Sequence, residues 1–354
     1  MSERPPIEII PTDSGLKGSA AVQWYDRWEK NFSFEGCEDR AGFHRIAAES
    51  LPQLPSPVQN TAPSAGIRLR FRSNTAVLSL KAEIMFLPDM SRMTRAGSHG
   101  FDLYVGCDGE VPVYKQTFMP ESGSRQVLGE YVLPDGGRMR DFELNFPLYN
   151  GVAQFALGLS GNARLQPAIP RRLDKPVIFY GSSITQGGCA SRPGNAYVNL
   201  LAQQLQIPTV NLGFSGNAKG EPEVARYIAS RPMAAFVMDY DNNAESPEAL
   251  MATHEPFFRI IREAQPSLPI VLLSRPNFDA DPADGARRRE VVRRTYELAR
   301  AAGDKRVWFI DGQELFGTEL RDACTVDGCH PNDLGFYRMY RRIRPVLEEA
   351  LCIQ

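Results

Sequence analysis

Histidine is scarce in this chain, and the scarcity narrows the search for catalytic chemistry. Four histidines occur in 354 residues: His44, His99, His254 and His330. Only His330 has a carboxylate at a useful spacing, because Asp327 lies three residues before it. Within one turn of chain this carboxylate can reach Nδ1 of the imidazole and leave Nε2 free to accept a proton. The spacing indicates a general base that can activate a serine hydroxyl.

Three more polar segments directly follow apolar runs, at residues 181–187, 211–217 and 239–243. The first of them contains Ser182 and Ser183. In a parallel sheet the carboxyl ends of the strands form one edge, where ligands bind. At that edge Gly216 offers a backbone N–H that no side chain covers, and Asn243 offers an amide, both of which suit a tetrahedral oxyanion. A serine, a base, an acid and two oxyanion donors together make a complete site for acyl transfer.

The second half of the chain has the pattern that such a sheet requires. Short apolar runs predict strands at 177–180, 209–212, 235–240, 270–273 and 307–310. Amphipathic runs between and after them predict helices at 196–205, 221–230, 247–264, 287–302 and 333–351. Alternation of strands and helices predicts a three-layer α/β/α fold whose parallel sheet is covered on both faces.

The first half of the chain has a different period. Residues 66–85 alternate apolar and polar side chains across a Ser-Asn turn, which predicts a half-buried hairpin. Further strands are expected at 32–36, 43–47, 101–106, 111–118, 125–133, 142–147 and 153–159. Many short strands predict an antiparallel β-sandwich of the jelly-roll kind. Prolines at 167 and 170 mark a linker, so we expect a sandwich domain at 1–172 and an α/β domain at 173–354.

The polar segments, in this order, resemble the sequence blocks of the SGNH/GDSL hydrolase superfamily. Residues 181–185 read GSSIT, similar to the first block, and Ser183 matches the position of the family's nucleophile. Ser182 stands where the family usually has aspartate. Residues 211–216 are similar to the second block, and Gly216 matches its oxyanion donor. The resemblance implies that the backbone N–H of Ser183 is also part of the oxyanion hole.

The remaining blocks complete the resemblance. The family's third block is usually Gly-x-Asn, whereas this chain has Asp241-Asn242-Asn243 and departs at the glycine. Asn243 matches the third oxyanion donor, with Asn242 as the alternative. Asp327-Gly328-Cys329-His330 matches the family's Asp-x-x-His. By this resemblance Ser183, Asp327 and His330 form the catalytic triad.

A signature in the first half extends the resemblance over the chain. Residues 100–104 read GFDLY, similar to the Gly-x-Asp-Leu-Tyr motif of a jelly-roll domain that precedes some of these hydrolases. That subset resembles carbohydrate and acetyl esterases, and some relatives are acyltransferases. The resemblance implies a serine esterase that hydrolyses a short-chain ester, acetyl above all, of a carbohydrate or another small alcohol. An acyltransferase that passes the acyl group to a small alcohol is the alternative, and a non-catalytic carbohydrate-binding protein is a second one.

Composition sets further expectations. Lys and Arg total 40 and Asp and Glu 42, a net charge of −2, so we expect no nucleic-acid or membrane partner. The ligand that the family resemblance implies is a small-molecule ester such as an acylated sugar. No apolar run reaches the roughly 18 residues of a membrane span. No secretory leader is recognised at the N-terminus, which predicts a cytoplasmic protein. Neither a Gly-x-Gly-x-x-Gly nor a P-loop motif occurs, and no cofactor or metal is expected; the oligomeric state stays open.

Several of these residues also have purely structural interpretations. Serine is a favoured helix N-cap, which alone would explain Ser183. Cys324 and Cys329 beside His330 offer only part of a zinc site, because no second ligand pair lies nearby in sequence. Arg275 follows the fourth expected strand and either binds substrate or braces a loop. The arginine run at 287–294 is expected on a solvated helix face.

Overall fold

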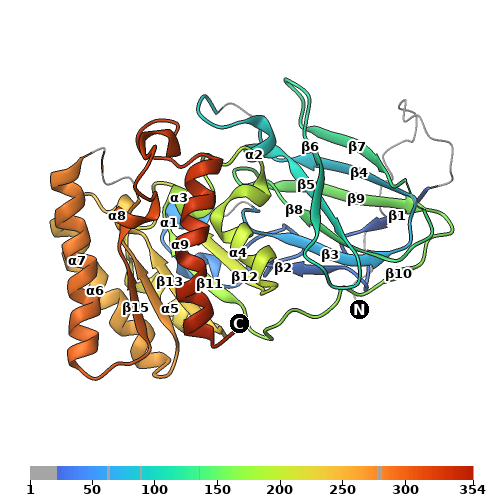
Figure 1. The fold of residues 1–354 in the computed structure, drawn as a ribbon. Coiled ribbons are helices and arrows are strands. Elements are labelled where there is room, and N and C mark those ends of the chain that lie inside the picture. The colour runs from blue at the N-terminus through green and yellow to red at the C-terminus, as the bar shows by residue number, and fades with distance from the viewer. Residues whose placement is uncertain are drawn as a thin grey trace.

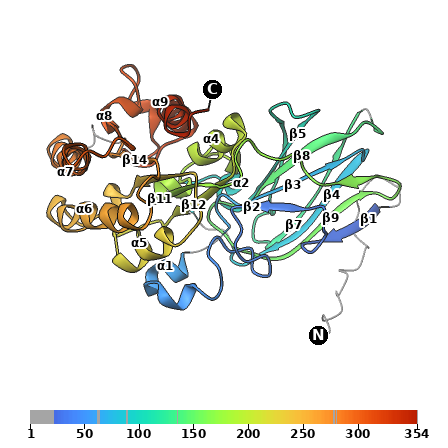
Figure 2. The same cartoon turned by 90° about the horizontal axis from the view of Figure 1, so that it is seen from below.

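A computed structural model describes residues 22–61, 64–87, 90–134, 136–276, 279 and 281–353. A β-sandwich part and an α/β part lie side by side (Figures 1 and 2). The N-terminal residues on which the absence of a leader was judged lie outside the described residues. None of the helices in the described ranges is long and apolar enough to cross a membrane.

Two antiparallel sheets build the sandwich. One has the order β1 (Val22–Asp26), β9 (Val152–Ser160), β4 (Val77–Ile84) and β7 (Gln126–Val132). The other has the order β10 (Leu165–Gln166), β3 (Arg68–Ser73), β8 (Arg140–Asn145), β5 (Phe101–Gly106) and β6 (Val113–Phe118), with β2 (Ser33–Glu35) against β3. Apolar side chains of both sheets share one buried core. The predicted antiparallel sandwich is confirmed, and β1 is a strand that the sequence pattern did not indicate.

The predicted hairpin at 66–85 is wrong in its pairing. Its two strands exist, but β3 pairs with β8 while β4 pairs with β9 and β7, so they lie in opposite sheets. The turn between them crosses the sandwich, and the Thr75 hydroxyl there donates to the carbonyl of Val77 and bonds Ser160. The polar face of β3 is buried as well, since Arg68 and Arg70 pair with Glu143. The alternation of apolar and polar residues in β3 therefore reflects a layer of buried ion pairs and not a face exposed to solvent.

The expected strand at 43–47 is also wrong, because this segment forms turns. Phe43 has a φ of +51°, and only an isolated bridge joins Asp39 and His44. Arg45 is fully buried, and its Nη1 donates to the carbonyls of Asn211 at 2.7 Å and Gly213 at 2.9 Å. The segment forms turns in place of a paired strand because the Arg45 side chain extends into the α/β part.

The α/β part contains a five-stranded parallel sheet with the order 12-11-13-14-15. Its strands are β11 (Val177–Gly181), β12 (Thr209–Gly213), β13 (Ala235–Asp239), β14 (Ile270–Leu273) and β15 (Val307–Ile310). All five match the predicted strands to within a residue. Gly181 pairs with Gly213 and with Asp239, so the ends of β11, β12 and β13 lie level at one edge.

Helices cover both faces of this sheet, as predicted. Alternate strand residues point to opposite layers: Phe236 packs in the core with α5 (Pro222–Ala229), α6 (Pro247–Ala264) and α7 (Pro282–Ala301). Val237 packs in the other core with α4 (Tyr197–Leu205) and α9 (Asp333–Leu351) (Figure 2). α7 begins five residues before its expected start, because Asp281 caps it by accepting from the N–H of Asp284. The short helices are α1 (Ser56–Asn60), α2 (Arg95–His99), α3 (Ser183–Gln186) and α8 (Gly312–Leu315).

The Gly-x-Asp-Leu-Tyr segment lies where the two parts meet. Asp102 on β5 is fully buried, and its carboxylate accepts from the N–H of Gly194 at 2.7 Å and from Nδ2 of Asn145 at 2.8 Å. The Tyr104 hydroxyl accepts from Arg192 at 2.7 Å. These bonds hold the loop that follows α3 against the sandwich. The boundary between domains at residue 172 stays a prediction, since side chains of both parts share cores.

Replacing Asp102 by alanine should destabilise the protein. The N–H of Gly194 and the amide of Asn145 would lose their acceptor inside the interface, at a cost of about 1–3 kcal/mol each. Urea unfolding of Asp102→Ala should therefore give a lower free energy of unfolding than wild type. Asp174 is exposed and serves as the control, since Asp174→Ala should change this free energy by less than about 0.5 kcal/mol. Equal values for both variants would contradict a role of Asp102 in joining the parts.

Candidate active site

The turn from β11 into α3 presents Ser183 at the sheet edge. Ser182 is the N-cap of α3, and its hydroxyl accepts from the N–H of Ile184 at 3.1 Å. Capping is thus performed by Ser182, which leaves the hydroxyl of Ser183 for another partner. Glycine is required at 181, because a Cβ there would overlap Thr185 Oγ1 and the carbonyl oxygen of Asp239. Tight packing of this turn fixes where Ser183 lies.

Hydrogen bonds connect Ser183 to His330 and His330 to Asp327, although Ser183 and Asp327 are 144 positions apart in the chain. Ser183 Oγ is 3.0 Å from Nε2 of His330. Nδ1 of the same imidazole is 2.9 Å from Oδ2 of Asp327. Ser183 is buried, whereas the His330 side chain beside it is partly exposed to solvent. This geometry suits proton transfer from a serine hydroxyl to an imidazole held by a carboxylate.

Asp327 is held in its ionised form. Burial raises its pKa, but the backbone N–H and ring of His330 and the backbone N–H of Cys329 donate to the carboxylate and outweigh burial. The pKa of Asp327 is therefore well below its usual value. An ionised acceptor favours the tautomer with the proton on Nδ1 of His330, which leaves Nε2 able to accept from the hydroxyl of Ser183.

Two backbone N–H groups at this edge have no partner among the described residues. Gly216 is exposed with a φ of +72°, and its N–H forms no hydrogen bond. The N–H of Ser183, at the first position of α3, is likewise unpaired. The positive φ at 216 is a backbone conformation that residues with a side chain rarely adopt, and it sets the direction of this N–H. Both groups are available to a developing negative charge.

The two neighbouring asparagines have different partners. Nδ2 of Asn243 donates to the carbonyl of Phe214 at 2.9 Å, which places this amide beside the Gly216 segment and leaves its second N–H free of that bond. Nδ2 of Asn242 instead lies 3.4 Å from Sγ of Cys329. The geometry favours Asn243 over Asn242 as the partner of Gly216.

Arginines behind the asparagines brace this segment. Arg288 is buried, and its Nη1 donates to the carbonyls of Asp241 at 2.6 Å and Ala244 at 2.9 Å. The expectation that the whole run at 287–294 is solvated is therefore wrong at this position, because one side of α7 packs on the sheet edge. The backbone N–H of Arg275 donates to Oδ2 of Asp241 at 2.9 Å, and its guanidinium pairs with Asp284 at 2.9 Å. These two contacts of Arg275 are with carboxylates of the chain itself.

A second carboxylate lies beneath the serine turn. Oδ2 of Asp239 accepts from the hydroxyls of Thr185 and Tyr197, both at 2.8 Å. Burial, together with the nearby charge of Asp241, raises the pKa of Asp239 to about 7. Thr185 and Tyr197 oppose this rise only in part. Asp239 links the first block to the end of β13.

The sandwich part also reaches the site, through residues that the sequence analysis missed. The Tyr149 hydroxyl donates to the carbonyl of Ser183 at 3.2 Å. Gln186 on α3 donates to the carbonyl of Leu148 at 3.0 Å and accepts from the N–H of Ser215 at 2.9 Å. Arg92 contacts Asp327. No motif or period marked Tyr149, Leu148 or Arg92, since their partners are more than 25 positions away in sequence.

The other histidines lie apart from Ser183. His254 on α6 is buried and bonds Thr295 at 2.8 Å, and His44 pairs with Asp39 at 3.5 Å. His99 ends α2 and bonds Ser98. No three His, Cys, Asp or Glu side chains gather in a way that could hold a metal ion within the described residues.

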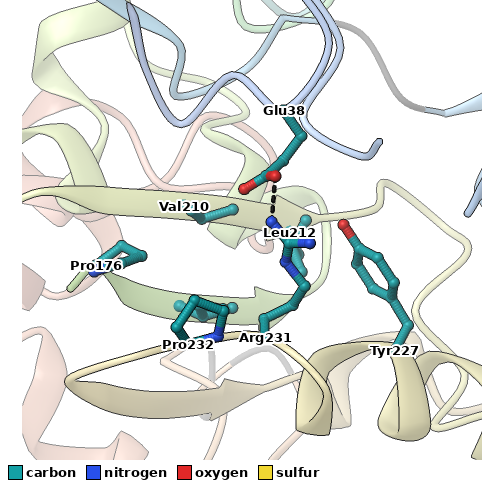
Figure 3. Close-up of a pocket in the computed structure, with 8 residues that line it drawn as sticks. Glu38, Pro176, Val210, Leu212, Tyr227, Arg231 and Pro232 are labelled. Carbon is teal, nitrogen blue, oxygen red and sulfur yellow. Dashed lines mark hydrogen bonds and ion pairs between the residues drawn. The ribbon is translucent and has the colours of Figure 1, made fainter. Parts of the chain in front are cut away.

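One cavity lies at the opposite end of the sheet. It has a volume of about 90 Å³ and lies where β11 and β12 begin, beside Pro176 (Figure 3). Glu38 and Arg231 form an ion pair across it. Its walls contain none of the residues that surround Ser183, so this cavity is separate from the candidate site.

Comparison with protein families gives two adjacent matches. Residues 174–348 match the GDSL-like lipase/acylhydrolase family. Residues 22–165 match the N-terminus of SGNH-hydrolase-type esterases. No curated protein sequence matches the chain.

Solved structures resemble the whole chain. A protein described as a GDSL-like lipase from Bacteroides ovatus is 28% identical with a TM-score of 0.83, over 94% of this chain and 99% of that one. The salicylyl-acyltransferase SsfX3 of a tetracycline biosynthetic pathway is 22% identical with a TM-score of 0.72, over 93% and 97%. A family two carbohydrate esterase from Cellvibrio japonicus is 14% identical with a TM-score of 0.61, over 94% and 99%. The acyltransferase and the carbohydrate esterase share the fold of this chain.

The buried carboxylate of Asp239 predicts a pH dependence of stability. Its pKa in the folded protein lies above that in the unfolded chain, so the folded protein binds this proton more tightly than the unfolded chain does. The resulting stability is complete below about pH 4 and is lost as the pH rises through 7. Asp239→Asn does not titrate, so its free energy of unfolding relative to wild type should increase by up to about 1.4 kcal/mol per pH unit across this window.

This difference is measured by urea unfolding of both proteins at intervals from about pH 4.5 to 8, a range that covers most of the window between the unfolded and folded pKa values. Asp174→Asn is the control, because Asp174 is exposed. A difference between Asp239→Asn and wild type that stays constant with pH would show that Asp239 does not titrate in this range.

Proposed function

The chain belongs to the GDSL-like lipase/acylhydrolase family and is a serine hydrolase, and on this premise we propose that it hydrolyses a short-chain ester, an acetyl ester above all, of a carbohydrate or another small alcohol. The observation that carries the proposal is the hydrogen-bonded series from Ser183 through His330 to Asp327. The carbohydrate esterases among the solved structures that resemble the chain support the choice of substrate.

In the first half-reaction His330 Nε2 takes the proton of Ser183 as Oγ attacks the ester carbonyl. Asp327 stabilises the imidazolium that forms and keeps its orientation. The carbonyl oxygen becomes an oxyanion that accepts from the N–H groups of Ser183 and Gly216 and from the amide of Asn243. His330 then returns the proton to the leaving alcohol, and Ser183 carries the acyl group.

In the second half-reaction water attacks the acyl-enzyme. His330 takes a proton from the water, and the same oxyanion donors stabilise the second tetrahedral intermediate. Collapse of this intermediate releases the carboxylic acid and returns the proton to Ser183. An alcohol bound in place of the water would receive the acyl group instead, and the protein would then act as an acyltransferase.

Product analysis distinguishes these two outcomes. Incubation of the protein with an acetyl ester, with and without an added sugar or other alcohol, shows whether acetate or a new ester accumulates. Acetate as the main product in both cases supports hydrolysis. A new ester that replaces most of the acetate would make the chain an acyltransferase and overturn the hydrolase proposal.

Loss of the nucleophile should abolish turnover. We expect Ser183→Ala to lose nearly all hydrolysis of p-nitrophenyl acetate, because the residual rate in such variants comes from binding and the oxyanion hole alone. His330→Ala should behave in the same way. Wild-type rates in Ser183→Ala would show that another residue is the nucleophile.

The two asparagines should differ in their effect on rate. Asn243→Ala removes an oxyanion donor and should lower kcat by about 10²–10³ with little change in KM. Asn242→Ala is the matched control, since its amide contacts Cys329, and its kcat should stay within about tenfold of wild type. The reverse order in steady-state kinetics would assign the donor to Asn242.

A further inference from the structure

An arginine of the sandwich part contacts the acid of the proposed triad. Nη1 of Arg92 is 2.8 Å from Oδ2 of Asp327. The same oxygen lies 2.9 Å from Nδ1 of His330, so guanidinium and imidazole share one acceptor. The side chain of Asp327 is only 10% exposed, whereas that of Arg92 is 68% exposed. Arg92 therefore covers the carboxylate from the solvent side.

The backbone that carries Arg92 is anchored on the α/β part. The neighbouring Met93 side chain is buried in the core that also contains Ile184 of α3. The Thr94 hydroxyl donates to the carbonyl of Ser191 at 2.6 Å and accepts from the N–H of Gly97 at 3.0 Å, which caps α2. Anchoring on the residues next to it reduces the freedom that Arg92 loses when it binds Asp327.

The charges around the His330–Asp327 pair are few. Among the described residues, Arg92 and His330 are the basic side chains paired with Asp327. The thiols of Cys189 and Cys329 also lie near Asp327, and burial raises the pKa of both, that of Cys189 to about 11. Both thiols are neutral near pH 7, and the charge of Arg275 acts on Cys329. Arg92 is therefore the arginine that pairs directly with the carboxylate beside the base.

We propose that Arg92 is a positioning residue for the catalytic pair, which orients Asp327 toward His330 and adds a fixed positive charge beside the imidazole. This inference rests on the proposed function. A charge-assisted bond to Oδ2 fixes the rotation of the carboxylate. The fixed positive charge of Arg92 also repels positive charge that develops on the imidazole during proton transfer, so its removal is expected to alter the pH dependence of the reaction. In this way the sandwich part sets the pH range of the α/β part.

The test compares Arg92→Gln and Arg92→Lys with a matched control. Arg138 is an exposed sandwich arginine, 63% exposed and paired with Asp108 at 3.3 Å, so Arg138→Gln removes an equivalent charge away from the site. Two quantities are measured across pH: kcat/KM for p-nitrophenyl acetate, and the rate at which a fluorophosphonate labels Ser183, located by mass spectrometry. Labelling reports the nucleophile directly and needs no turnover.

We expect the acidic limb of both profiles to move to higher pH in Arg92→Gln, by about half to one pH unit, the effect of one partly screened charge a few ångströms away. KM should change little, since Arg92 acts through Asp327. Arg92→Lys should restore the limb, and Arg138→Gln should match wild type. High NaCl should move the wild-type limb toward that of Arg92→Gln and leave the variant unchanged.

An acidic limb in Arg92→Gln at the wild-type position, with wild-type labelling at Ser183, would overturn the positioning role while leaving the proposed function intact. Equal shifts in Arg92→Gln and Arg138→Gln would also overturn it, because they would reflect net charge alone. Absence of labelling at Ser183 in wild type would contradict the serine mechanism itself, and the role of Arg92 with it.

Discussion

The close approach of the turn after β11 to its neighbours is the constraint on which the site depends. Gly181 lies against Thr185 and the carbonyl of Asp239, in register with Gly213 on β12. A side chain at 181 would push α3 away from the sheet. Because the ends of β11, β12 and β13 lie level, the residues that follow them meet at one edge, and the segment before α9 places His330 3.0 Å from Ser183 there.

The sequence was most informative where one local pattern determines the structure. The parallel strands are short apolar runs between helices, so β14 and β15 agree with their predicted bounds. The fold class is confirmed for the same reason. The proximity of Ser183, Asp327 and His330 follows from strand order and from the three-residue spacing of the last two, while their catalytic roles stay predictions.

Sequence patterns were misleading where contacts between distant segments determine the local structure and the burial of a side chain. Alternation in β3 indicated a solvated face, but its arginines pair with buried Glu143. The segment at 43–47 had the composition of a strand, yet Arg45 leaves the sandwich for the carbonyls of Asn211 and Gly213. Tyr149 and Arg92 contact the site from the other part of the chain. Such contacts depend on how two distant segments pack, which no local period records.

The contact of Arg45 with β12 has a consequence for how the chain folds during synthesis. Its acceptors on Asn211 and Gly213 are made about 166 residues later. Ile46 and Val58 also pack in the core beneath α5, which is translated later still. The early segment therefore keeps side chains of the buried type uncovered until β12 and α5 have left the ribosome. Contacts of such long range slow folding and lengthen the time during which the nascent chain can aggregate.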